Sequence, residues 1–410
     1  MKIALLVPHI FMHQAILPEV IFSPAELAIN LATNLAKKGH EVIIFSPGSI
    51  KEYLQNTTVE NVTADLSLFE AELAQRGDTY LELLKKHPLT YITLARQVQS
   101  ELVAKAYEQA NAGQFDLVHV WCNEEEIALV NARFCRVPVV FTHHEPFNFL
   151  TRYRAIFPKY AQLNWISMSL AQRKTFEQQA HQSVNWVGNV YHGLPATQYQ
   201  FQKEPGDYLL YLGRIIQPKG VHYAIVAAKQ AGLKLKIAGK HYAGQSKDQY
   251  WQEFIEPELK QSEVEYVGFV RETPAKQALL GGAQALLMPS TWQEPFGLVM
   301  AEALACGTPV IGFDQGAIPE VVENGTNGWV VPYEAEDRIK KNDKQVNKNW
   351  AKLRQDQHFK ANVQNLTSAI QKNSRIDRRA CRQSFEQSFT LKQMVAGYEE
   401  IYQTLLKTRE

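Results

Sequence analysis

Residues 285–312 read ALLMPSTWQEPFGLVMAEALACGTPVIG and contain one complete strand, loop, helix and strand. The apolar run at the start has the length of a strand, and Pro289 and Ser290 end it. A loop that carries Glu294 leads into a helical stretch, and a second apolar run follows at residues 309–312. A strand, a helix and another strand in this order are typical of a parallel sheet with crossover helices.

The same alternation of short apolar runs and helical stretches continues along the chain. The remaining strand candidates are residues 3–7, 42–45, 117–121, 137–142 and 165–168 in the first half and residues 208–212, 233–238, 264–267 and 329–331 in the second. Residues 193–206 between the halves are polar, contain two prolines and lack periodicity, as linkers do. A chain of 410 residues is also too long for one ordinary core. The sequence therefore predicts an α/β protein with two doubly wound parallel-sheet domains, residues 1–195 and 205–389. A last helix within residues 390–410 is expected to pack back onto the first domain.

The balance of charges limits the partners that the chain can have. Lys and Arg number 43 and Asp and Glu 42, so the formal net charge is +1 and no nucleic acid or strongly acidic partner is expected. A local basic patch would still allow peripheral contact with a membrane. The first apolar run, residues 3–7, is too short for a signal peptide or a spanning helix, which favours a cytoplasmic location. Cys122, Cys135, Cys306 and Cys381 are far apart in sequence and are expected to be reduced thiols.

The loop that carries Glu294 is placed for ligand binding. In open α/β sheets, ligands bind beyond the carboxyl ends of strands, and this loop follows such an end. The helix that begins near Gly297 offers free backbone N–H groups and a partial positive charge to a phosphate or sugar oxygen. Glu302 lies on this helix about two turns further along, so one ligand could meet both carboxylates. Two glutamates at this spacing also occur by chance as solvated or capping residues. The intervening Pro-Phe-Gly-Leu and the following Ala-Cys-Gly-Thr-Pro-Val make the pattern specific.

This stretch closely resembles the donor-site signature of the family 4 retaining glycosyltransferases (glycosyl transferases group 1), which have the GT-B fold. The likeness extends over most of the chain. The matching segments are residues 211–214 with 219–220, residues 316–322 and 327–331 and, more loosely, residues 35–42 and 115–119. The resemblance implies two Rossmann-like domains that face each other across a cleft. The N-terminal domain would bind the acceptor and the C-terminal domain the nucleotide sugar.

The resemblance also implies a role for each matching residue. The implied donor-binding residues are Gly213, Arg214, Lys219, Phe296, Gly297, Leu298 and Glu302. Arg214 and Lys219 would bind the diphosphate, and the backbone of residues 296–298 would face sugar and phosphate. Glu302 would accept the ribose hydroxyls, and Glu294, counted as catalytic, would hold the sugar hydroxyls. The chemistry agrees, because cleavage of a glycosyl–phosphate bond builds negative charge on the leaving diphosphate, and fixed cations there lower the barrier.

A second catalytic candidate follows a strand of the first half. Residues 141–145 read Phe-Thr-His-His-Glu. The family often has Thr-x-His here, with its histidine near the reacting sugar, and this pattern selects His144 over His143. The alternative is a structural histidine without a role in chemistry.

Metal and cofactors are not expected. The chain has no Asp-x-Asp pair and no His-Glu-x-x-His, so cationic side chains and a helix N-terminus would replace a metal ion. The reaction implied is retaining transfer of a hexose from a UDP- or GDP-sugar, with UDP-hexose favoured over GDP-mannose, to a sugar, a lipid or a small molecule. A non-catalytic sugar-nucleotide-binding protein of the same fold is the alternative. A Rossmann oxidoreductase is disfavoured because no Gly-x-Gly-x-x-Gly follows the first strand.

The first loop departs from the family pattern, and a polar segment lies near the end of the chain. Many members have a Gly-Gly pair before the first helix, where this chain has Ser23 and Pro24. We expect a capping box here, with Ser23 as N-cap, Pro24 at the first helical position and Glu26 at the third. Residues 334–373 are polar and rich in Lys, Asn and Gln, which predicts an exposed helical insertion.

Overall fold

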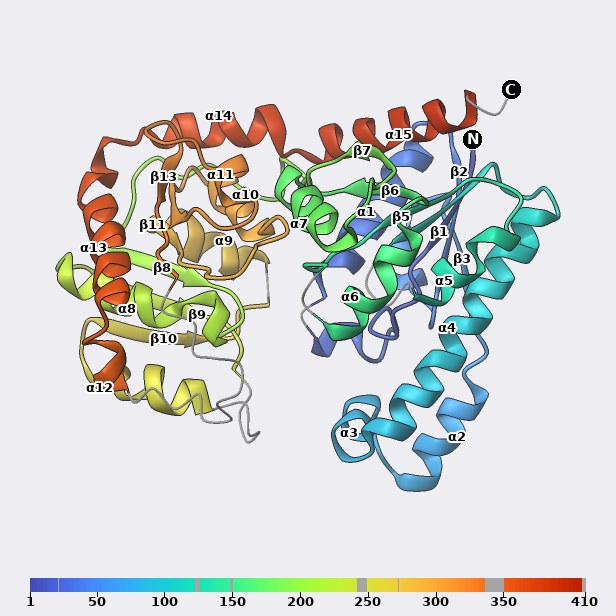
Figure 1. The fold of residues 1–410 in the computed structure, drawn as a ribbon, viewed down its shortest axis with the longest axis horizontal. Helices are drawn as coiled ribbons and strands as arrows, with labels where there is room; N and C mark the ends of the chain where they lie inside the picture. The colour runs from blue at the N-terminus through green and yellow to red at the C-terminus, as the bar shows by residue number, and fades with distance from the viewer. Residues whose placement is uncertain are drawn as a thin grey trace. The chain divides into compact units, whose positions relative to one another are not determined.

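The computed structural model describes residues 1–20, 22–121, 126–147, 150–241, 249–271, 273–335 and 350–407 (Figure 1). The chain forms two compact units. The N-terminal unit is Met1–Gly193 with Leu391–Glu410, and the C-terminal unit is Leu194–Thr390. Each unit has its own parallel sheet and its own hydrophobic core.

The sheet of the N-terminal unit has the strand order β3-β2-β1-β4-β5-β6-β7, and every pair is parallel. Its strands are β1 (Lys2–Leu6), β2 (Glu41–Ser46), β3 (Glu60–Thr63), β4 (Leu117–Trp121), β5 (Val139–Thr142), β6 (Asn164–Ser167) and β7 (Trp186–Asn189). The five strands predicted in this half are confirmed. The two edge strands, β3 and β7, were not predicted from the sequence. Glu60 of β3 is exposed and the other residues of both strands are only partly buried, so they lack the continuous apolar run of an inner strand.

Helices cover this sheet (Figure 1). They are α1 (Ser23–Lys37), α4 (Pro88–Asn111), α5 (Glu126–Asn131), α6 (Thr151–Ile156), α7 (Leu170–Ala180) and α15 (Leu391–Lys407). Two further helices, α2 (Ser67–Arg76) and α3 (Tyr80–Lys86), lie beside the end of α4 that is remote from the sheet. The last helix, α15, lies against α1 and β7. Tyr398 and Tyr402 on α15 are fully buried, and Glu399 forms an ion pair with Lys38 and a hydrogen bond with His40 at the end of α1.

The start of α1 corrects one prediction. The helix begins at Ser23 itself, and its N-cap is Phe22, whose side chain has no oxygen to accept a hydrogen bond. The predicted capping box with Ser23 as N-cap is therefore wrong. Proline is tolerated throughout the first turn, because N–H groups there have no intrahelical partner, so Pro24 does not define the first residue of the helix.

The C-terminal unit has a sheet of order β10-β9-β8-β11-β12-β13, again with parallel pairs. Its strands are β8 (Tyr208–Leu212), β9 (Lys234–Ala238), β10 (Val264–Gly268), β11 (Ala283–Met288), β12 (Val310–Phe313) and β13 (Gly328–Val331). All six predicted strands of this half are confirmed. Its helices are α8 (Val221–Gln230), α9 (Thr273–Gly281), α10 (Leu298–Ala305), α11 (Ile318–Val321), α12 (Trp350–Leu353), α13 (Gln357–Lys372) and α14 (Arg378–Ser388).

Helix α13 contradicts the expectation that residues 334–373 form an exposed insertion. It packs along α8 and contributes to the core of the unit (Figure 1). Its buried apolar residues are Phe359, Val363, Leu366, Ala369 and Ile370. These apolar residues recur at helical spacing in a segment that is mostly polar. The prediction of an exposed segment rested on its overall composition and did not take this periodicity into account. Residues 336–349 of this segment lie outside the described residues.

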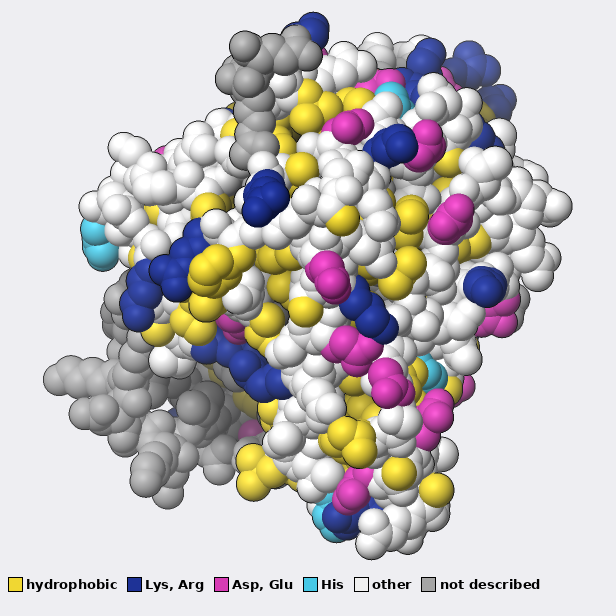
Figure 2. All heavy atoms as spheres, turned by 90° about the vertical axis from the view of Figure 1, so that its right-hand side faces the viewer, with side chains coloured by type: hydrophobic (Ala, Val, Ile, Leu, Met, Phe, Trp, Pro, Cys, Tyr) yellow, Lys and Arg dark blue, Asp and Glu magenta, His cyan; other side chains and the backbone are white. Residues whose placement is uncertain are grey.

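The surface agrees with the near balance of charges. Basic, acidic and apolar side chains are all present over the face shown in Figure 2. Across the ranges that the structure describes, none of the helices is both long and apolar enough to span a bilayer.

Candidate functional site

The candidate site lies at the carboxyl ends of β8 and β11 in the C-terminal unit. These strands are neighbours, but the chain proceeds from β8 to β9 and β10 on one side and from β11 to β12 and β13 on the other. A point where the strand order reverses in this way opens a crevice beyond the strands, and ligands bind there. Arg214 and Lys219 follow β8, and Glu294 follows β11, so the fold brings together residues far apart in sequence.

The loops after β8 and β11 are joined through their backbones. The Thr291 N–H donates to the Pro218 carbonyl oxygen at 2.8 Å. Gly220 has a φ of +71°, and a Cβ at this position would lie 1.9 Å from the Pro289 carbonyl oxygen. Only glycine allows this approach, so Gly220 keeps the loop that carries Lys219 against the loop of Glu294.

A third loop, after β12, holds the backbone of Glu294. The Ala317 N–H donates to the Glu294 carbonyl oxygen at 2.8 Å. Gly316 has a φ of +59°, and a Cβ there would lie 2.2 Å from the Glu294 nitrogen. The Gly-Ala pair at the start of residues 316–322 therefore positions the main chain of Glu294.

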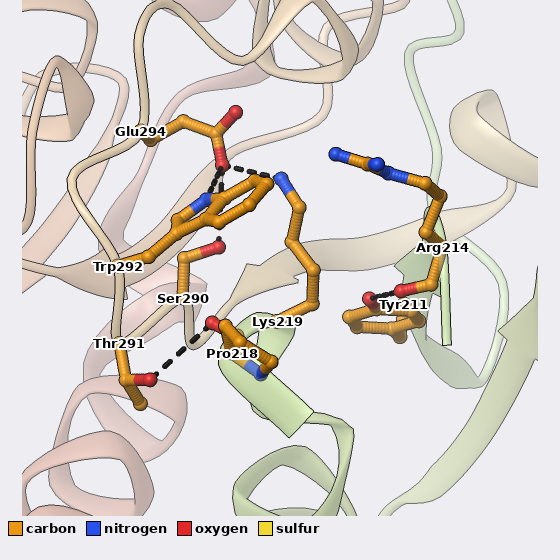
Figure 3. A network of polar contacts seen from close by, with 8 residues as sticks. All are labelled: Tyr211, Arg214, Pro218, Lys219, Ser290, Thr291, Trp292 and Glu294. Carbon is orange, nitrogen blue, oxygen red and sulfur yellow. Dashed lines mark hydrogen bonds and ion pairs between the residues drawn. The ribbon is translucent and has the colours of Figure 1, made fainter. Parts of the chain in front are cut away.

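The side chain of Glu294 is the centre of a polar cluster (Figure 3). Its Oε2 atom accepts hydrogen bonds from Lys219 Nζ at 2.5 Å, from Trp292 Nε1 at 2.8 Å and from Ser290 Oγ at 3.3 Å. Burial raises the pKa of Glu294, but the charge and hydrogen bond of Lys219, the Trp292 N–H and the charge of Arg214 lower it more. The net pKa lies below its ordinary value, so the buried carboxylate is ionised at neutral pH.

Arg214 joins the same cluster through Trp292. The Arg214 guanidinium carbon lies 5.3 Å from the centroid of the Trp292 ring, and Lys219 Nζ lies 4.6 Å from it. Both distances are within the range of cation–π interaction. The Arg214 carbonyl oxygen accepts a hydrogen bond from the Tyr211 hydroxyl at 2.7 Å, which anchors the main chain after β8.

The helix start predicted near Gly297 is confirmed. Gly297 is the N-cap of α10, and Leu298 is the first helical residue. The first N–H groups of a helix have no intrahelical partners, so this end of α10 offers donors to an anion. Phe296 has a buried side chain whose ring lies 5.9 Å from that of Phe389. Because this side chain is packed inside the unit, Phe296 can offer a ligand its backbone only.

Glu302, further along α10, forms a second cluster. Its Oε1 atom accepts from the Tyr199 hydroxyl at 2.8 Å and from Lys276 Nζ at 2.5 Å. Glu302 is 6% exposed, and Lys276 Nζ also lies 5.7 Å from the centroid of the Tyr199 ring.

Three of these side chains were not predicted from the sequence. Trp292 lies inside the signature stretch but carries no charge, and no motif singled it out. Tyr199 and Lys276 are 103 and 26 residues from Glu302 and belong to no motif, so no sequence signal would have found them.

His144 lies in the N-terminal unit, directly after β5. Its ring stacks on that of His192 with centroids 5.1 Å apart and lies 4.5 Å from the ring of Trp121. Among the described residues, neither ring nitrogen of His144 has a hydrogen-bond partner. Burial and the neighbouring histidines, His192 first among them, hold the pKa of His144 well below its ordinary value, so the imidazole is neutral.

The neighbouring His143 has a different environment. It is fully buried, and the rings of Phe147, Tyr153 and Phe157 surround it with centroids 4.7 to 4.9 Å away. His143 is therefore a core residue, whereas His144 is partly exposed.

The described residues hold no group of three or more His, Cys, Asp or Glu side chains that could bind a metal ion. Cys306 and Cys381 are buried free thiols, and Cys122 lies outside the described residues.

Several curated proteins are similar to this chain over part of its length. An uncharacterized glycosyltransferase of Methanocaldococcus jannaschii is 34% identical over 129 residues, 30% of this chain and 32% of that protein. The alpha-maltose-1-phosphate synthase of Mycolicibacterium smegmatis is 32% identical over 130 residues, 31% of this chain and 33% of the enzyme. The match spans about a third of the length of these relatives.

Solved structures match over the whole chain. HepE of Anabaena in complex with UDP and glucose has a TM-score of 0.66 at 18% identity, with 98% of this chain and 100% of that chain covered. Sucrose-phosphate synthase of Thermosynechococcus elongatus has a TM-score of 0.68 at 16% identity and 99% coverage of both chains. Together with the two parallel sheets, this likeness identifies the fold as GT-B.

Two family models account for most of the sequence. Residues 25–184 match the model described as Glycosyltransferase Family 4, and residues 197–365 match the model described as Glycosyl transferases group 1. The second match contains all the residues of the polar clusters in the C-terminal unit. The chain belongs to the group 1, family 4 glycosyltransferases.

Proposed function

We propose that this chain transfers a hexose from a nucleotide-sugar donor, a UDP-hexose in preference to GDP-mannose, to an acceptor hydroxyl with retention of the anomeric configuration and without a metal ion. The observation that carries the proposal is the cluster of Lys219, Arg214 and the ionised Glu294 at the point where the strand order reverses. The relatives add support, since HepE was solved with UDP and glucose.

The two cations would bind the diphosphate of the donor. Lys219 is a compact point charge, and Arg214 presents a planar fork that suits phosphate oxygens. Without donor, Lys219 is paired with Glu294. A diphosphate would share that charge, and the N–H groups at the start of α10 would add further donors. These groups would stabilise the negative charge that develops as the bond from the sugar C1 to the phosphate oxygen breaks.

Glu294 would orient the sugar. Among the described residues, the three hydrogen bonds to its side chain all reach Oε2. Its other oxygen, Oε1, would accept hydroxyl groups of the hexose. Because the carboxylate is ionised, these would be charge-assisted hydrogen bonds, which are stronger than neutral ones.

Glu302 would bind the ribose in a similar way. Tyr199 and Lys276 both reach Oε1, which leaves Oε2 to accept from the ribose hydroxyls. The pair of carboxylates at the two ends of one donor would then set its position along the crevice.

His144, the second catalytic candidate, would act as a neutral imidazole, with one ring nitrogen as donor and the other as acceptor. In the transfer step, the acceptor hydroxyl would attack the face of C1 from which the diphosphate departs. Its oxygen forms the new bond to C1, and its proton passes to the leaving phosphate oxygen.

The test begins with thermal unfolding in the presence of UDP-glucose, UDP-galactose, UDP-N-acetylglucosamine and GDP-mannose. A bound donor at 100 times its Kd stabilises the protein by about 2.7 kcal/mol, which a melting curve detects. Proton NMR of the donor that binds then follows its hydrolysis or transfer and gives the anomeric configuration of the product. Failure of all four to bind would refute the proposal. Binding without hydrolysis or transfer would favour the non-catalytic sugar-nucleotide-binding alternative.

A further inference from the structure

Trp292 contacts three residues of the proposed donor site, although no motif assigns it a role. Its indole N–H donates to Glu294 Oε2 at 2.8 Å, and its ring lies 4.6 Å from Lys219 Nζ and 5.3 Å from the Arg214 guanidinium carbon. The residues that it joins come from two loops, those after β8 and β11 (Figure 3).

The N–H group acts on the orientation of Glu294. A carboxylate that could rotate freely would present either oxygen to a ligand. Here Lys219, Trp292 and Ser290 all donate to Oε2, so this oxygen is committed to the protein. Lys219 would also have to serve the diphosphate, and the Ser290 contact is longer, at 3.3 Å. The indole N–H belongs to a rigid, neutral ring, so the charge of a diphosphate does not draw it away as it draws Lys219, and it stays the constant partner of Oε2.

The ring acts on the two cations. Arg214 and Lys219 carry like charges and would repel each other if they approached the same space without a ligand. The aromatic ring has a negative face, which attracts both cations and provides each with a partner while the diphosphate is absent. Pre-positioned cations cost less ordering when the ligand binds.

We propose that Trp292 is a positioning residue of the donor site: its N–H determines which oxygen of Glu294 faces the sugar, and its ring holds Arg214 and Lys219 ready for the diphosphate. This inference rests on the proposed function and extends it to a residue that does not itself need to touch the donor.

Two substitutions separate the two roles. Trp292→Phe keeps an aromatic ring and removes the N–H, whereas Trp292→Leu removes both. The matched control is Trp329→Phe in the same unit, because the Trp329 N–H is buried and has no hydrogen-bond partner among the described residues. Two probes are used. The first is the nucleotide sugar that binds the wild-type chain most tightly among UDP-glucose, UDP-galactose, UDP-N-acetylglucosamine and GDP-mannose. The second is the nucleoside diphosphate of that donor. Their Kd values are measured by calorimetric titration.

We expect the Kd of Trp292→Phe for the nucleoside diphosphate to be within about twofold of the wild-type value. The ratio of the Kd for the nucleoside diphosphate to the Kd for the nucleotide sugar, which measures the affinity that the sugar adds, should fall by about fivefold or more. Trp292→Leu should in addition weaken the nucleoside diphosphate itself by about fivefold or more. Loss of the N–H also removes one of the groups that lower the pKa of Glu294. The sugar-dependent affinity of Trp292→Phe should therefore disappear at a higher pH than that of the wild type as the solution is acidified.

Three outcomes would overturn the inference. Wild-type affinities of Trp292→Phe for both ligands would show that the N–H has no role. Equal losses for both ligands in Trp292→Phe, or losses of the same size in Trp329→Phe, would show a general structural effect. A wild-type chain that binds none of the four nucleotide sugars would refute the proposed function and this inference with it, so the two failures are distinguishable.

Discussion

Acidification from pH 7 to pH 5 should destabilise the N-terminal unit far more than the C-terminal unit, because buried histidines are concentrated in the former. Burial lowers the pKa of His119 and of His192 to about 3 and that of His143 to about 4. The pKa of the adjacent His144 is also well below its ordinary value. In the C-terminal unit, burial lowers the pKa of His222 to about 3.

The sign and the size of the effect follow from proton linkage. A histidine whose pKa is lower in the folded state binds fewer protons there than in the unfolded chain, where its pKa is about 6.5. Its contribution to stability is present above the unfolded pKa and is lost as the pH falls toward the folded pKa. For a folded pKa of 3 to 4, the loss between pH 7 and pH 5 is about 2 kcal/mol for each histidine. The free energy of unfolding of the N-terminal unit then falls by about 6 kcal/mol through His119, His143 and His192, and His144 adds to this loss. The C-terminal unit loses about 2 kcal/mol through His222. A loss of this size is comparable with the whole stability of a domain, about 5–15 kcal/mol.

The assay is urea unfolding at pH 7 and pH 5, with pulsed hydrogen exchange and mass spectrometry to assign each transition to peptides of one unit. His143→Phe is the test variant, because the ring of His143 is enclosed by three aromatic rings and phenylalanine has a similar shape. We expect its pH-dependent loss in the N-terminal unit to be smaller than that of the wild type by about 2 kcal/mol. The control is His181→Asn, at an exposed position with a φ of 52° that asparagine tolerates. Equal pH dependence of the two units, or of His143→Phe and the wild type, would refute the reasoning.

Three further predictions concern the site and the first helix. Glu294→Gln and Lys219→Ala should each leave the fold intact and reduce turnover by about tenfold or more, since each removes a charge from the donor site; near-wild-type turnover in both would contradict the donor-site assignment. Transfer should continue in EDTA because Arg214 and Lys219 supply the positive charge, and a complete loss that Mn²⁺ restores would show that a metal is needed. Ser23→Ala should change the free energy of unfolding by less than about 0.5 kcal/mol in urea titrations, because Ser23 lies inside α1 instead of capping it; a loss of about 1 kcal/mol would restore the capping interpretation.

The sequence by itself determined the class of fold and most of the strands. Residues 117–121 became a fully buried strand, because a parallel strand covered on both faces is a nearly continuous apolar run, here interrupted only by His119. The loop of Glu294 and the start of α10 at Gly297 were also predictable, since turn and helix signals are local in sequence. Edge strands such as β3 were not predicted. One of their sides has no strand to pair with, and their composition is not that of an inner strand.

The tertiary structure alone decided which side chains meet. Lys219 and Glu294 are 75 residues apart, and their ion pair forms because β8 and β11 are neighbours in the sheet. The contacts of Trp292 with both cations, and of Lys276 with Glu302, depend on the same packing of distant segments. Local patterns in the chain reflect local backbone preferences and burial. The contacts between distant residues arise only when several elements bury their apolar faces together, because this packing places the loops at the edge of the sheet next to one another.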